Sequence, residues 1–107
     1  MFNELTNEEF ELIMEDLTCG LYLKVICGDV FTTTIFYPEF EFTVFTNNSY
    51  QFGHKEFDDE INFQNIIIDV AHICTIHRCN ISPLFDAEQI IVKLLDDVEL
   101  ILQTDNC

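Results

Sequence analysis

The densest group of residues that could do chemistry is a set of two histidines and two cysteines within eight positions: His72, Cys74, His77 and Cys79. A zinc site needs four nitrogen or sulfur ligands that converge tetrahedrally, usually as pairs two to five residues apart on a turn. The surrounding sequence predicts a helix, on which the first and last members share one face and the middle two share another. One helix cannot direct all four side chains at a single ion, so we expect no metal and no cofactor. A half-site of two ligands, completed by His54 or Cys19, stays open as the alternative.

Catalytic chemistry has little support in the sequence. Cys74 and His77 have the spacing of a nucleophile and its base on one helix, but a strongly negative surrounding field disfavours the thiolate. Neighbouring carboxylates, which glycosidases use, are unavoidable with 20 acidic residues and carry little information. The sequence has no glycine-rich phosphate loop and no serine nucleophile motif. We therefore expect a protein that is not an enzyme.

The charge balance excludes two further classes of function. The chain has 107 residues with 20 acidic and 4 basic side chains, which gives a formal net charge of −16 at pH 7. Four cations cannot neutralise a phosphate backbone, so we expect no direct nucleic-acid binding and no membrane binding through a basic face. Hydrophobic residues make up 49% of the chain, which indicates a folded protein and argues against an acidic disordered tail. The first residues are acidic and contain no signal-like apolar run, which predicts a cytoplasmic protein.

A helix is predicted near the start of the chain. Thr6 is a good N-cap, and Glu9 three residues later completes a capping box. Apolar residues then recur at helical spacing and define a buried stripe, made of Phe10, Ile13, Met14 and Leu17. Gly20 is the expected end of the helix.

A block of β-strands is predicted to follow, over residues 21–27, 30–37, 40–45 and 50–52. These segments alternate in polarity or are rich in β-branched and aromatic residues, and short connections predict an antiparallel meander. Aromatic residues occupy both faces of the middle strands. The face that helices leave uncovered would then suit a partner or a second copy, so a homodimer is a further hypothesis.

Two more helices are predicted in the C-terminal half, over residues 61–79 and about 84–102, separated by the break at Ser82 and Pro83. The second of these would bury one stripe, formed by Ile91, Leu94, Leu95, Val98, Ile101 and Leu102. The order α-β-β-β-β-α-α predicts a single α+β domain over residues 1–107. It would have a small antiparallel sheet of three to four strands, one N-terminal helix and two C-terminal helices.

The acidic residues gather in three groups, and we predict that these groups bind a basic partner. The predicted partner-binding residues are Glu8, Glu9, Glu11, Glu15 and Asp16 on the first helix, Glu56, Asp58, Asp59 and Glu60 before the second, and Asp96, Asp97 and Glu99 on the third. On the first helix, Glu8, Glu11 and Glu15 would lie about 4.5 and 6 Å apart along the axis. That spacing is comparable in scale to the phosphates of a nucleic-acid strand, which occupy about 3.4 Å of axis each.

By size and composition the chain resembles the small acidic anti-defence proteins of phages, including anti-CRISPR proteins. The resemblance implies a non-enzymatic inhibitor that acts as a DNA mimic and binds a cationic nucleic-acid-binding enzyme, such as a nuclease, by protein–protein interaction. An immunity protein or antitoxin that neutralises a basic nuclease toxin is an alternative, because it too would place acidic residues against a cationic surface. An acidic adaptor domain, whose charge serves solubility alone, is another.

Overall fold

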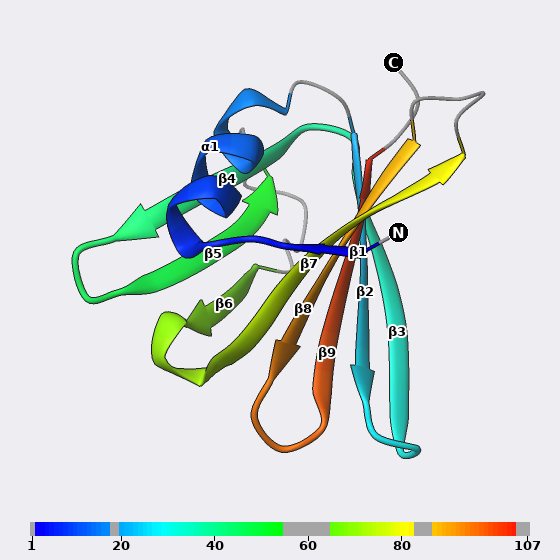
Figure 1. Cartoon of the computed structure of the whole chain (residues 1–107). Helices are drawn as coiled ribbons and strands as arrows, with labels where there is room; N and C mark the ends of the chain where they lie inside the picture. Colours follow the sequence, from blue (N-terminus) through cyan, green and yellow to red (C-terminus); the bar gives the residue numbers. More distant parts are fainter. Residues whose placement is uncertain (1, 18–19, 55–64, 83–86, 105–107) are drawn as a thin grey trace, which may run out of the picture.

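The computed structural model describes residues 2–17, 20–54, 65–82 and 87–104, and most of these residues lie in β-strands (Figure 1). The elements run in the order β1 (Phe2–Glu4), α1 (Asn7–Asp16), β2 (Leu21–Cys27), β3 (Phe31–Tyr37), β4 (Phe40–Phe45), β5 (Ser49–His54), β6 (Ile66–Asp69), the 3-10 helix η1 (Val70–His72), β7 (Ile73–Ser82), β8 (Ala87–Leu94) and β9 (Val98–Thr104).

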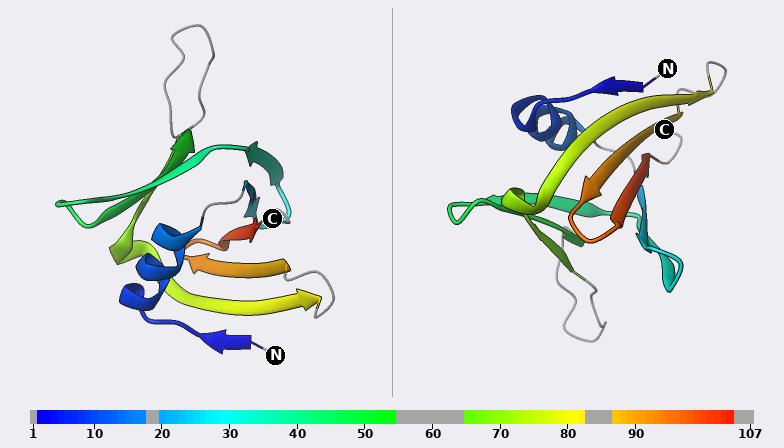
Figure 2. Two further views of the ribbon diagram at one scale, coloured as in Figure 1. Left: turned by 90° about the horizontal axis from the view of Figure 1, so that it is seen from above. Right: turned by 60° about the horizontal axis from the view of Figure 1, so that its bottom comes forward.

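Two antiparallel sheets contribute to one hydrophobic core. The larger sheet has six strands in the order β1-β7-β8-β9-β2-β3, and the smaller has three in the order β4-β5-β6. The chain passes between the sheets at two corners, since Pro38 and Glu39 join β3 to β4 and η1 joins β6 to β7. The left panel of Figure 2 shows the two sheets from above, with α1 beside one end of both.

Helix α1 forms where the sequence predicts it, with the predicted capping box. Thr6 Oγ1 accepts a hydrogen bond from Glu9 N at 3.2 Å, and Glu9 Oε1 accepts one from Thr6 N at 3.1 Å. The inward side of α1 buries Phe10 and Met14, and the Phe10 ring stands edge-on to that of Phe42 with centroids 5.6 Å apart. These contacts fix α1 on the three-stranded sheet. Among the described residues, no helix has the length and apolar character needed to cross a membrane.

The six-stranded sheet has two distinct faces. Leu21 and Leu23 of β2 are almost completely buried and lie in register with β9, where Leu23 pairs with the buried Leu102. We call the side that carries these leucines the inner face. The alternating residues form the outer face, on which Tyr22 and Lys24 are exposed.

The four predicted strands of the β block form, but the predicted meander divides into two hairpins. β2 pairs with β3 and β4 pairs with β5, whereas β3 and β4 belong to different sheets. Pro38 lies at the corner between them. Proline has no backbone N–H and cannot donate a hydrogen bond to a strand ladder, which suits it to the end of a pairing.

The prediction of two C-terminal helices is wrong, and with it the predicted α+β fold class. The described part of 61–79 forms β6, η1 and most of β7, and the described part of 84–102 forms β8 and most of β9. The protein is mainly β, with two sheets and one described α-helix. The buried residues alternate with a period of two, as Ile90 with Val92 and Leu100 with Leu102 show.

Candidate functional site

Helix α1 presents most of its predicted acidic residues to solvent. Glu8, Glu9, Glu15 and Asp16 are exposed. Because Phe10 and Met14 hold the opposite side of the helix in the core, these carboxylates sit on a rigid support. We call these four residues the acidic helix face.

Glu11 differs from the other acids of α1 because its carboxylate has an internal partner. Tyr50, which is 1% exposed, donates a hydrogen bond from its hydroxyl to Glu11 Oε1 at 2.8 Å. Burial raises the pKa of the Tyr50 hydroxyl, and the hydrogen bond to Glu11 and the charge of its carboxylate raise it further. Glu11 therefore helps to fix α1 on β5, and we do not place it in a partner-binding surface.

The distribution of charge along α1 is unfavourable at its C-terminal end. Glu8 and Glu9 lie in the first turn, where the helix dipole favours negative charge. Glu15 and Asp16 lie at the other end, where the dipole disfavours it, and the last turn carries no basic residue. Each acid in that position costs about 0.3 to 1 kcal/mol of stability.

The acids between β8 and β9 occupy a tight turn. Asp96 and Asp97 both have positive φ, at 63° and 59°, a region that glycine adopts most readily and in which asparagine and aspartate are also enriched. The turn is held against the β2–β3 connection, since Asp97 O accepts a hydrogen bond from Gly28 N at 3.0 Å. Both side chains are exposed.

The structure separates Glu99 from Asp96 and Asp97, although the sequence groups them. Glu99 lies within β9 on the outer face, and its register partner on β8 is Lys93. Opposite charges directly across two strands compensate each other, so Glu99 adds little to a negative surface. The predicted group Glu56, Asp58, Asp59 and Glu60 lies outside the described residues.

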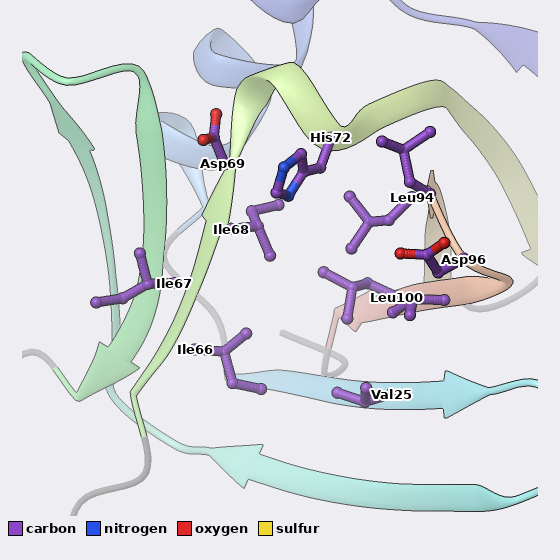
Figure 3. A pocket seen from close by; sticks show the side chains of 11 residues that line it. Val25, Ile66, Ile67, Ile68, Asp69, His72, Leu94, Asp96 and Leu100 are labelled. Carbon is purple, nitrogen blue, oxygen red and sulfur yellow. The ribbon is translucent and has the colours of Figure 1, made fainter.

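A cleft of about 350 Å³ opens beside the β8–β9 turn (Figure 3). It is lined by eight aliphatic residues and three that ionise: Val25, Ile66, Ile67, Ile68, Leu94, Leu95, Val98 and Leu100, with Asp69, His72 and Asp96. Figure 3 shows the side chains of Ile68, Leu94 and Leu100 within the cleft, with His72 and Asp96 at its border. A volume of this size accepts a large side chain or a small molecule. We call it the aliphatic cleft.

Sequence reasoning missed the aliphatic cleft because it placed β6 and η1 inside a helix. The signal was present in the run Ile66-Ile67-Ile68-Asp69, since consecutive β-branched residues favour a strand and Asp favours its end. In the structure the Asp69 carboxylate accepts a hydrogen bond from Ala71 N at 2.9 Å and caps η1.

The histidine and cysteine cluster does not assemble into a metal site within the part of the chain that the structure describes. No group of three or more potential ligands comes together there. His72 lies in η1, whereas Cys74, His77 and Cys79 lie in β7, so the predicted helical arrangement of this cluster is wrong. The extended backbone of β7 places His77 and Cys79 on the same face of the sheet.

Comparison with known protein families, with characterised proteins and with solved structures finds no match to this chain.

Proposed function

We propose that the protein is a non-enzymatic inhibitor that binds a basic partner protein, of the class of nucleic-acid-binding enzymes such as nucleases. Its carboxylates would take the place of nucleic-acid phosphates. The observation that carries the proposal is that exposed acids occupy positions where a neutral or basic residue would be more stable. These positions are the last turn of α1, where the helix dipole disfavours negative charge, and the β8–β9 turn, where two acids are adjacent.

Because these acids lower the stability of the fold, we infer that their charge serves a function. Glu15 and Asp16 oppose the helix dipole, and Asp96 and Asp97 place two like charges next to each other in one turn. The net charge of −16 adds self-repulsion in the compact state. A solvated surface that served solubility alone would need only about 2 to 8 charges, so solubility does not explain the excess.

The aliphatic cleft adds an apolar component beside the β8–β9 turn. Asp96 both lines the cleft and belongs to the acidic turn, so charge and apolar surface meet there. Strong protein interfaces combine an apolar or aromatic anchor in a pocket with polar groups at its rim. A partner segment with one large apolar side chain flanked by arginine or lysine fits this arrangement.

Affinity capture with DNA as a competitor tests the proposal. The immobilised protein is exposed to lysate from its host at low and high salt, and the bound proteins are identified by mass spectrometry. We expect a nucleic-acid-binding enzyme that salt and added DNA both displace, because the acids and DNA would compete for the same cationic groove. The captured enzyme, once purified, should lose activity when the protein is added.

Charge-matched variants locate the binding surface. Glu8→Gln, Glu15→Gln and Asp16→Asn together remove three charges from the acidic helix face, and Asp29→Asn, Glu39→Gln and Glu41→Gln remove three exposed charges elsewhere. We expect the first set to weaken inhibition at least about tenfold and the second to change it little. Capture that neither salt nor DNA affects, or equal losses from both sets, would contradict the proposal.

A further inference from the structure

Strand β3 forms one border of the six-stranded sheet. It pairs with β2 over its whole length, from Phe31 with Cys27 to Tyr37 with Leu21. Within the described ranges, no strand pairs with its other edge. Figure 1 shows β3 at the right-hand side of the molecule, with no labelled element beyond it. The outer edge of β3 therefore offers backbone N–H and C=O groups that another strand could bind.

β3 differs from the other edge strands in its charge. Within the described residues, the edge strands β1, β4 and β6 each carry an acid, namely Glu4, Glu41 and Asp69. β3 has the sequence Phe-Thr-Thr-Thr-Ile-Phe-Tyr and carries no charge. Charged side chains on an edge strand protect it from pairing with another chain. That protection is present on three edges and missing on the longest one.

Exposed apolar side chains gather around the same edge. Val30, just before β3, is 93% exposed, and Phe31 and Phe36 are 52% and 42% exposed. Phe36 stacks on the outer face against Tyr22 of β2, with ring centroids 4.4 Å apart. Exposed aromatic surface next to an open strand edge is typical of a contact surface.

We propose that β3 pairs antiparallel with β3 of a second copy of this chain, across a two-fold axis that passes beside Thr34. Residues opposite each other in an antiparallel pair point to the same face, so the two sheets continue into one another only if the paired numbers have the same parity. The register that overlaps all seven residues places Thr34 opposite itself. It also places Phe36 opposite Thr32 and Phe31 opposite Tyr37.

The charge distribution favours a second copy at this edge. Two molecules with a net charge of −16 repel each other, so they can associate only where few acids meet. The single charged residue of β2 is Lys24, which is exposed on the outer face and lies in register with Thr34. Two lysines and no acid from β2 or β3 would therefore lie beside the two-fold axis. The acids that flank β3, Asp29 and Glu39, lie beyond its two ends, whereas β4 and β6 carry an acid within the strand that would pair.

The size of the contact sets its expected strength. A seven-residue strand is about 24 Å long, and one strand edge alone buries less than the roughly 800 Å² per partner of a standard interface. We therefore expect a dimer that dissociates on dilution. Salt should strengthen it, because screening removes repulsion between the copies. Binding to a basic partner has the opposite salt dependence, so this proposal and the proposed function can fail separately.

Sedimentation velocity over a range of protein and salt concentrations tests the dimer. Thr34→Glu combined with Lys24→Gln places two like charges opposite each other at the two-fold axis, with no lysine in register to compensate them, and should raise the dissociation constant at least about tenfold. Thr46→Glu combined with Lys24→Gln makes the same change in net charge but places the glutamate at an exposed turn, and it serves as the matched control, for which we expect little change. Circular dichroism checks that both variants keep the fold.

Cross-linking tests the register. Thr34→Cys places two thiols directly opposite each other, within the distance range that a disulfide spans, and peptide mapping by mass spectrometry should show residue 34 linked to residue 34. Thr46→Cys is the control and should give no link between residue 46 of one copy and residue 46 of the other. A chain that stays monomeric at every concentration and salt, a dimer that Thr34→Glu combined with Lys24→Gln leaves intact, or links that join other positions would overturn the proposal.

Discussion

At the scale of single residues, the acidic side chains divide into structural and exposed ones. Glu11 accepts a hydrogen bond from the buried Tyr50 and belongs to the packing of α1 on β5. Asp16 has an exposed carboxylate at the end of α1, where the helix dipole disfavours negative charge, and Asp97 has an exposed carboxylate in a turn with a positive φ. Substitution separates the two kinds, because removing a structural interaction destabilises the fold and removing a misplaced charge stabilises it.

The Tyr50–Glu11 hydrogen bond gives a prediction for stability and its pH dependence. Tyr50→Phe should lower the free energy of unfolding by about 1 to 2 kcal/mol at pH 7, because a hydrogen bond to a charged group is lost. The pKa of Tyr50 is raised in the folded protein above its ordinary value of 10.0, so the unfolded chain loses the proton first. Stability should therefore fall as the pH rises above 10, and fall less steeply in the variant.

Urea unfolding of the wild-type protein and of the Tyr50→Phe variant between pH 7 and pH 11 measures this pH dependence of stability. Tyr37, whose pKa burial also raises, is present in both proteins and contributes the same background. Equal slopes above pH 10 would show that the Tyr50 hydroxyl does not control that part of the profile.

The β8–β9 turn gives a second prediction at this scale. Asp97 adopts a φ of 59°, which glycine adopts without steric cost, and a non-glycine residue there costs on the order of 1 kcal/mol. Asp97→Gly should raise the free energy of unfolding by up to about 1 kcal/mol, as measured by thermal denaturation. Asp29→Asn removes one exposed charge without this conformational effect and is the control. A variant no more stable than that control would contradict the interpretation.

At the scale of elements, the sequence identified some segments correctly because a single periodicity was visible in them. α1 has both a capping box and one apolar stripe, and β2 alternates cleanly, so both form as predicted. β8 and β9 are apolar on both faces. Ile90 and Val92 fill the core, while Ile91 is half-buried on the outer face, and this mixture also fits a helical stripe. Only the pairing with distant strands decides between a helix and a strand for these segments, and that pairing cannot be recognised from the sequence.

The dependence on tertiary contacts also decides which parts of the candidate site could be predicted from the sequence. The acids of α1 and of the β8–β9 turn were found from composition, because surface charge needs no tertiary contacts to be recognised. The aliphatic cleft was not found, because it forms only when β6 and η1 lie beside β8, β9 and β2. Its lining comes from three separate stretches of the chain.

The dipole of α1 predicts opposite effects from the same chemical change at its two ends. Glu15→Gln removes a charge from the last turn and should raise the free energy of unfolding by about 0.3 to 1 kcal/mol. Glu8→Gln removes one from the first turn and should lower it by a similar amount. Chemical denaturation at low ionic strength measures both, and each variant serves as the control for the other. Changes of the same sign in both would show that overall charge outweighs the dipole.

At the scale of the whole molecule, charge is distributed unevenly. The two exposed lysines of the described residues, Lys24 and Lys93, both lie on the outer face of the six-stranded sheet. The acids lie chiefly on α1, on β4 and in the turns. The outer face of the six-stranded sheet is therefore less negative than α1, β4 and the turns.

Self-repulsion predicts that salt stabilises this protein. Raising the NaCl concentration from about 0.01 to 1 M shortens the screening length from about 30 to 3 Å, so the free energy of unfolding should rise. A variant with Glu8, Glu15, Asp16, Asp29 and Glu41 replaced by their amides should show a smaller rise in urea unfolding experiments. A rise of the same size in both proteins would attribute the effect to general salting-out.

The position of β2 in the six-stranded sheet has a consequence for how the chain acquires its structure. β2 pairs with β9, so Leu21 lies opposite Thr104, and β1 pairs with β7 in a similarly distant contact. Contacts of such high sequence separation slow folding, because long loops must close before any pairing is gained. During synthesis we expect β2 and β3 to be exposed to solvent as a hairpin until β9 leaves the ribosome. We infer that the acids of the nascent chain then reduce its aggregation, a benefit that would precede the native state.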